Sequence, residues 1–228
     1  MAITYVGNAT WTEAIEWAWM VIDISWLSPS VGDIILVYVW YSSKNYSASM
    51  VTAWYTWLGI NAVEDDSKDL SVYGFYKLYS GVWDNSVSIA TTTWGANFRA
   101  AWLVSVFRWV DSTQPLDVTP TVWSSRNTWI PNPPAITPIT DWSMIVAIWS
   151  QSSAATNGNL VQPSWYTYAW AIEYDPWNVV KLAMWYKLRW WWTEDPWIFT
   201  NYRDSSSFCA AAWTVALRPW SNRRIFIT

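Results

Sequence analysis

The residues best suited to chemistry are carboxylates, and four of them fall within one short polar segment. Glu64, Asp65, Asp66 and Asp69 lie close together in the chain. Such a cluster could hold calcium, which takes oxygen ligands. The spacing matches no calcium-loop signature, so a solvated loop is the preferred interpretation, and calcium binding by residues 64–69 stays open.

Paired carboxylates could also hydrolyse glycosidic bonds. The visible pairs, Asp65-Asp66 and Glu194-Asp195, are adjacent in the chain, so their side chains diverge. The chain has no His and a single Cys, Cys209, which excludes Ser-His-Asp and Cys-His triads and histidine metal sites. No glycine-rich phosphate loop is present. We therefore predict a non-enzymatic protein with no cofactor and no metal site.

Aromatic side chains offer a different chemistry, because their flat faces can stack on sugar rings. Two aromatic stretches, residues 54–57 and 165–170, contain Tyr55 and Tyr166. These two tyrosines are the predicted glycan contacts. The alternative is that both belong to the hydrophobic core.

Composition excludes two classes of partner. Of the 228 residues, 53% are hydrophobic and 13% are charged, and the net charge is −4. No basic surface is available for nucleic acid. No uninterrupted apolar run has the length of a membrane span, so no membrane partner is expected.

Tryptophan is far too frequent, and it stands in places that suit glycine. The chain has 25 Trp and 7 Gly. Trp177 follows Asp175-Pro176, where a turn prefers glycine, and residues 190–192 form a Trp triplet in a polar loop. Some uncultivated bacteria and their phages translate UGA as glycine, and a translation that assigns UGA to Trp would produce this sequence. Genetic recoding is therefore our hypothesis; the alternative is a protein naturally rich in Trp. Trp102 and Trp213, in strand-like runs, are the best candidates for genuine tryptophan.

Short alternating or β-branched runs between turn residues predict many strands and no long helix. The predicted fold is an all-β antiparallel sandwich of the jelly-roll type. The proline-rich residues 112–138 predict an extended irregular linker. The main predicted strands are 2–6, 18–25, 34–41, 50–55, 70–79, 87–92, 98–107, 144–148, 165–170, 178–188, 198–201 and 208–217.

The same motifs occur twice in the same order, which predicts an internal repeat. We expect one domain over residues 1–228, with halves at 23–111 and 139–219 joined by 112–138. The motif pairs are residues 54–56 with 165–167, 75–78 with 185–188, 100–102 with 211–213, and Asp33 with Asp141.

The turn motifs resemble those of jelly-roll-type β-sandwich modules from phage virion and tail proteins and from some secreted bacterial surface proteins. That family has aromatic-Arg-Gly-Val-Asp, Asp-Gly-Ser and Pro-Ser-Gly-aromatic. Here Trp109, Trp142 and Trp165 stand at the three glycine positions of these motifs. The resemblance covers residues 23–219, and the family has no catalytic motif to transfer.

The resemblance implies a virion structural protein, either a tail or fibre module or a capsid-surface module. We expect it to be located in the virion and to assemble as a homo-oligomer or with other virion proteins. Host attachment through a surface polysaccharide is a further expectation. The alternative is an extracellular carbohydrate-binding or adhesion module on a bacterial surface.

Overall fold

The computed structural model contains three antiparallel β-sheets and one short 3-10 helix, η1 (Ser25–Leu27), among the residues that it describes. The predicted all-β antiparallel sandwich is confirmed. The described residues are 1–15, 19–41, 48–63, 70–81, 84–91, 98–126, 132–153, 163, 165–174, 179–189, 192–196 and 209–220.

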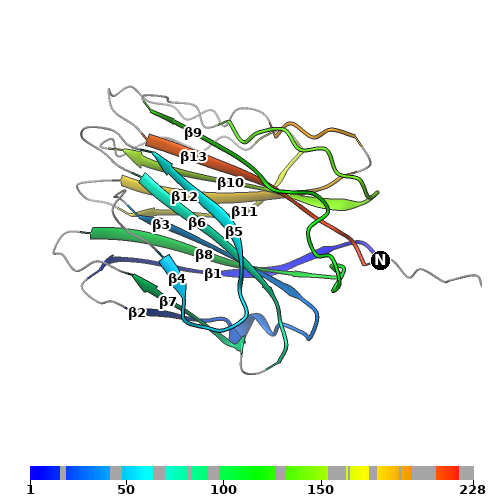
Figure 1. Cartoon of the computed structure of the whole chain (residues 1–228), viewed down its shortest axis with the longest axis horizontal. Coiled ribbons are helices and arrows are strands. Elements are labelled where there is room, and N and C mark those ends of the chain that lie inside the picture. The colour runs from blue at the N-terminus through cyan, green and yellow to red at the C-terminus, as the bar shows by residue number, and fades with distance from the viewer. Residues whose placement is uncertain are drawn as a thin grey trace, which may run out of the picture.

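Two sheets have five strands each, and the third sheet is smaller. The first sheet has the order β1 (Thr4–Ile15), β8 (Phe98–Arg108), β3 (Ile34–Tyr41), β6 (Leu70–Leu78), β5 (Thr56–Val63). The second has the order β11 (Thr167–Tyr174), β12 (Val179–Arg189), β10 (Ser143–Ser153), β13 (Cys209–Leu217), β9 (Thr121–Arg126). The small sheet has the order β2 (Trp19–Asp23), β7 (Ser86–Thr91), β4 (Ala48–Met50). In Figure 1, β9 and β13 lie at the top of the view and β2 and β7 at the bottom.

The first sheet is the middle layer, and β3 explains why. All eight residues of β3 are buried. Ile34, Leu36 and alternate residues contact the core shared with the second sheet. Ile35, Val37 and their alternates contact the core shared with the small sheet. A strand has two faces, so burial of both requires a continuous apolar run rather than alternation.

Both five-stranded sheets have the same strand order. We number the five strands of each sheet in chain order. The first strand (β1 or β9) pairs with the fifth (β8 or β13), and the fifth pairs with the second (β3 or β10). The second then pairs with the fourth (β6 or β12), which pairs with the third (β5 or β11). In the first half, β1, β8, β3, β6 and β5 lie in one sheet, and β2, β7 and β4 lie in the other.

The hydrogen-bond ladders align the two halves residue by residue. Ile34 pairs with Leu78 and Phe107, while Met144 pairs with Leu188 and Leu217. Ile34 therefore corresponds to Met144, and the rest of each sheet follows from this match. The Trp-Tyr-Thr and Tyr-Lys-Leu motifs fall on equivalent positions, as their sequences suggest.

Two motif pairings made from the sequence are corrected by this register. Asp33 corresponds to Ser143 rather than to Asp141. Trp102 pairs with Val39 and corresponds to Ala212 rather than to Trp213. A shift of one residue reverses the face of a strand, so Trp102 packs toward the small sheet and Trp213 packs between the two large sheets.

Two strand predictions also need correction. Residues 51–55, predicted as part of a strand, form a turn, and the following β5 extends to Val63. The proline-rich linker, predicted as irregular, contributes β9, which pairs with β13 at the edge of the second sheet. Edge strands tolerate nearby proline because one of their sides needs no ladder bonds. The predicted strand 198–201 lies outside the described residues.

Candidate functional site

The polar side chains of interest gather at one end of the sandwich, which we call the turn end. There β3, β5, β10 and β11 begin, and β6, β8, β12 and β13 finish. The ends of β8 and β13 meet, because Val110 bridges to Pro219 and Asp111 N donates to Arg218 O at 2.9 Å. The turn end therefore contains the turns of both halves.

Tyr55, one predicted glycan contact, belongs to a closed ion-pair cluster at the turn end. Lys77 Nζ lies 5.7 Å from the centre of the Tyr55 ring and donates to Ala53 O at 3.1 Å. The same ammonium group pairs with Asp84, and both side chains are almost fully buried, at 8% and 3% exposed. Burial, followed by the negative charge of Asp84, raises the pKa of the Tyr55 hydroxyl.

Tyr166, the other predicted glycan contact, has the equivalent place in the second half. Lys187 Nζ lies 5.4 Å from the centre of the Tyr166 ring and 3.2 Å from Glu194 Oε1. Arg189 Nε lies 2.8 Å from Glu194 Oε2. Tyr166 is 2% exposed, so it has no ring face open to a sugar in this structure. Burial and then Glu194 raise the pKa of its hydroxyl.

The sequence analysis missed these two lysine–carboxylate pairs, although a signal was present. In each half, a Tyr-Lys-Leu motif is followed by a carboxylate seven residues after the lysine. Adjacent carboxylates drew attention to Glu194-Asp195, but the structure separates them: Glu194 is buried and Asp195 is exposed. The spacing of seven residues, which both halves share, identifies the carboxylate that pairs with each lysine.

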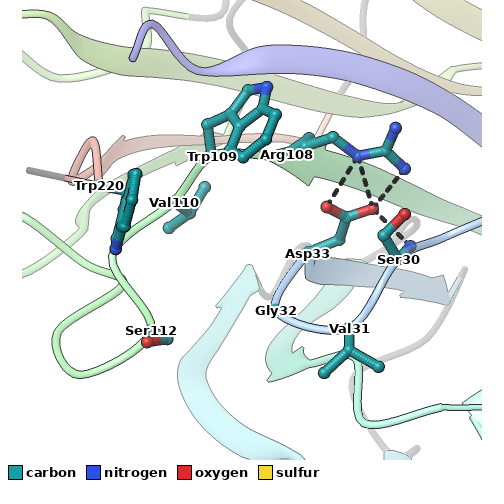
Figure 2. A pocket seen from close by; sticks show the side chains of 9 residues that line it. All are labelled: Ser30, Val31, Gly32, Asp33, Arg108, Trp109, Val110, Ser112 and Trp220. Carbon is teal, nitrogen blue, oxygen red and sulfur yellow. Dashed lines mark hydrogen bonds and ion pairs between the residues drawn. The ribbon is translucent and has the colours of Figure 1, made fainter. Parts of the chain in front are cut away.

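A cavity of about 410 Å³ lies between the turn before β3 and the segment after β8 (Figure 2). Arg108 Nη2 lies 2.9 Å from Asp33 Oδ2, and Ser30 N donates to the same oxygen at 2.8 Å. In Figure 2, Trp220 lies on the side of the view away from Asp33, and Trp109 lies beside Arg108. The Arg108–Asp33 ion pair joins the ends of β3 and β8. Because Arg108 and Ser30 N already occupy the Asp33 carboxylate, we assign this pair a structural role.

The second half has a matching arginine–aspartate pair, but its carboxylate comes from the linker. Arg218 Nε donates to Asp117 Oδ1 at 3.1 Å, and Asp117 is fully buried. Asp117 Oδ2 also accepts from Ile139 N at 2.7 Å, Thr140 N at 3.0 Å and Ser143 Oγ at 3.1 Å. Asp117 thus connects β13, the linker and the start of β10, a role that the sequence analysis had not predicted.

Four tryptophans at the turns have left-handed backbone. Among the described residues, Ser28 is the one other non-glycine residue with positive φ. Such backbone costs an L-residue about 1–2 kcal/mol. Trp54 and Trp165 are also 87% and 85% exposed. The four tryptophans and their φ values are Trp54 (71°), Trp109 (67°), Trp142 (66°) and Trp165 (71°).

We expect the stability of the sandwich to fall in acid, because Asp84 is held in its charged form. Burial alone would raise the pKa of Asp84, but hydrogen bonds from Lys77 and Ser80 outweigh it and lower the pKa. A carboxyl group whose pKa in the folded protein is below its unfolded value of about 3.9 stabilises the fold at pH values above about 3.9. This contribution is lost as the pH falls through the pKa of the folded state. Melting temperatures from pH 7 to pH 2 should therefore differ between the wild type and Asp84→Asn near neutrality and converge below about pH 4. A constant difference across this range would contradict the assignment.

The described residues contain no group of three or more His, Cys, Asp or Glu side chains placed to hold a metal ion. The acidic segment 64–69 lies outside those residues. No helix in the described part of the chain has the length and hydropathy needed to cross a membrane. The turn end has a buried lysine–carboxylate pair, a partly exposed one and two arginine–aspartate pairs. This arrangement is suited to holding strand ends and to binding polar groups.

Comparisons of this chain with protein-family models, with curated proteins and with solved structures found no match.

Proposed function

We propose that this chain is a structural module of a phage virion, from the tail, a fibre or the capsid surface, that acts by assembly rather than by catalysis. The supporting observation is the backbone at Trp109, Trp142 and Trp165. These are the three positions at which the resembled family has glycine, and each has a φ between 66° and 71°. A chain that resembled the family by chance would have no reason to place left-handed turns there.

We further propose that the native protein has glycine at most of the turn tryptophans, through recoding of UGA. The internal repeat supports this, because it supplies a comparison inside the same chain. Trp142 corresponds to Gly32, whose φ is 91°. Trp170 follows the bulge in β11, where the first half has Gly59 after the bulge in β5.

Side-chain packing, by contrast, supports tryptophan at position 213. Trp213 is 1% exposed, and its ring lies 6.1 Å from that of Tyr38. A Cβ on Gly59 or Gly74 would come within 3.2 Å of the Trp213 ring. These two glycines therefore provide the space that a large side chain at position 213 needs.

Peptide mass spectrometry of virus-like particles, purified from the sample that encodes this gene, tests both proposals. We expect peptides of this chain to co-sediment with particles, and the peptides spanning 109, 142 and 165 to have the mass of glycine at those positions. Peptides found only among cell-surface proteins would contradict the virion proposal and favour the adhesion module. Peptides with tryptophan mass would contradict recoding alone.

A further inference from the structure

The two lysine–carboxylate clusters form a natural comparison, because one half serves as a reference for the other. In the first half, Tyr79 occupies the position that Arg189 has in the second. The Tyr79 hydroxyl donates to Asn85 Oδ1 at 2.7 Å, and Tyr79 is 6% exposed. The first cluster is thus closed and contains one cation and one carboxylate.

The second cluster is open and more highly charged. A cavity of about 440 Å³ is lined by two cations and two carboxylates: Lys187, Arg189, Glu194 and Asp195. Its size is typical of small-molecule sites. Lys187 and Arg189 are 18% and 27% exposed, against 8% for Lys77. The lining residues are Trp165, Lys187, Arg189, Thr193, Glu194, Asp195 and Pro196.

The walls of this cavity are held in place by ordinary backbone structure. Ile136 and Glu194 exchange two backbone hydrogen bonds of 2.8 Å, and the hydroxyls of Thr137 and Thr193 are 2.9 Å apart. Arg189 Nη2 donates to Thr193 O at 3.2 Å. Polar groups that are positioned before a ligand arrives bind it at a lower entropic cost.

Donors and acceptors alternate along the cavity wall. Glu194 has one oxygen 3.2 Å from Lys187 Nζ and the other 2.8 Å from Arg189 Nε, and Asp195 adds an exposed carboxylate. Neighbouring hydroxyls of a sugar ring each donate and accept, so they match such a row. The charges of the two cations and two carboxylates that line the cavity cancel. The whole chain has a net charge of −4. Both features disfavour an anionic polymer.

We propose that this cavity binds a neutral polysaccharide through the hydroxyls of one or two sugar units. The proposal rests on the proposed function for the source of the glycan, a host surface, and it supplies the ligand class and the contacts. Because the polar groups come from β12 and residues 193–195, they remain in place whether residue 165 is tryptophan or glycine.

Affinity electrophoresis in native gels containing soluble dextran, β-glucan, mannan or galactan tests the proposal. We expect at least one of these polymers to retard the protein. Arg189→Gln and Asp195→Asn should weaken the interaction about tenfold or more, since each removes a charged hydrogen-bonding group. Asp195 is exposed, so its variant reports on binding even if Arg189→Gln unfolds.

Tyr79→Phe is the matched control, because it alters the equivalent position of the closed cluster and should leave retardation unchanged. Absence of retardation by all four polymers would overturn the proposal, and so would equal retardation of all variants. A gel with polygalacturonate serves as the anionic control polymer. Retardation by polygalacturonate alone, removed by salt, would also overturn the proposal, because that behaviour is ionic adsorption. None of these failures would affect the co-sedimentation of the chain with particles.

Discussion

Replacing Trp54, Trp109, Trp142 and Trp165 together with glycine should raise the stability of the fold. Left-handed backbone costs an L-residue about 1–2 kcal/mol, and the greater freedom of glycine in the unfolded chain returns up to about 1 kcal/mol of this. With about 1.5 kcal/mol of strain relieved and about 1 kcal/mol returned at each site, the net gain should be about 2 kcal/mol for the four sites if they act independently. Urea unfolding measures the gain, with the midpoint and slope compared with those of the chain that has tryptophan at the four positions.

Two controls separate backbone strain from loss of an exposed indole. Alanine at the same four positions removes the indoles but retains the Cβ, so it should recover little of the gain. Trp26→Gly removes an indole that is 66% exposed in η1 and is not among the residues with positive φ. Trp26→Gly should therefore leave stability unchanged or lower. A quadruple glycine variant no more stable than the alanine variant would contradict the strain argument.

Replacing Asp117 with alanine should be among the most damaging single changes in the chain. It leaves Arg218 without its carboxylate and removes the acceptor for two backbone N–H groups and for Ser143. Breaking a buried ion pair by removing one partner costs about 3–5 kcal/mol. That loss is a large part of a typical domain stability of about 5–15 kcal/mol. We expect a strong fall in melting temperature and in the yield of soluble protein.

Asp141→Ala is the matched control for Asp117→Ala. The sequence motifs pair Asp141 with Asp33, whereas the structure places Asp141 on the surface. An exposed substitution of this kind changes stability by less than about 0.5 kcal/mol. If Asp141→Ala were as damaging as Asp117→Ala, the register between the two halves would be wrong.

The candidate site could be predicted in part. The Trp-Tyr-Thr and Tyr-Lys-Leu motifs located the clusters of Tyr55 and Tyr166, because repeated local patterns occupy equivalent turns and strand ends. Aromatic type alone suggested that both tyrosines contact sugar. In the structure, Tyr55 and Tyr166 lie instead against Lys77 and Lys187. The carboxylate partners of these lysines, Asp84 and Glu194, follow the strands that contain the lysines.

The sequence by itself determined the fold class, most of the strands and the turns at which glycine is expected, because alternation and turn chemistry are local properties. The tertiary structure alone decided the register between the halves and the partners of the buried charges. Trp102 and Trp213 exchange faces through a shift of one residue, and Arg218 finds Asp117 across 101 positions of the chain. Such choices depend on which strands pair and on what they bury, and no local pattern contains that information.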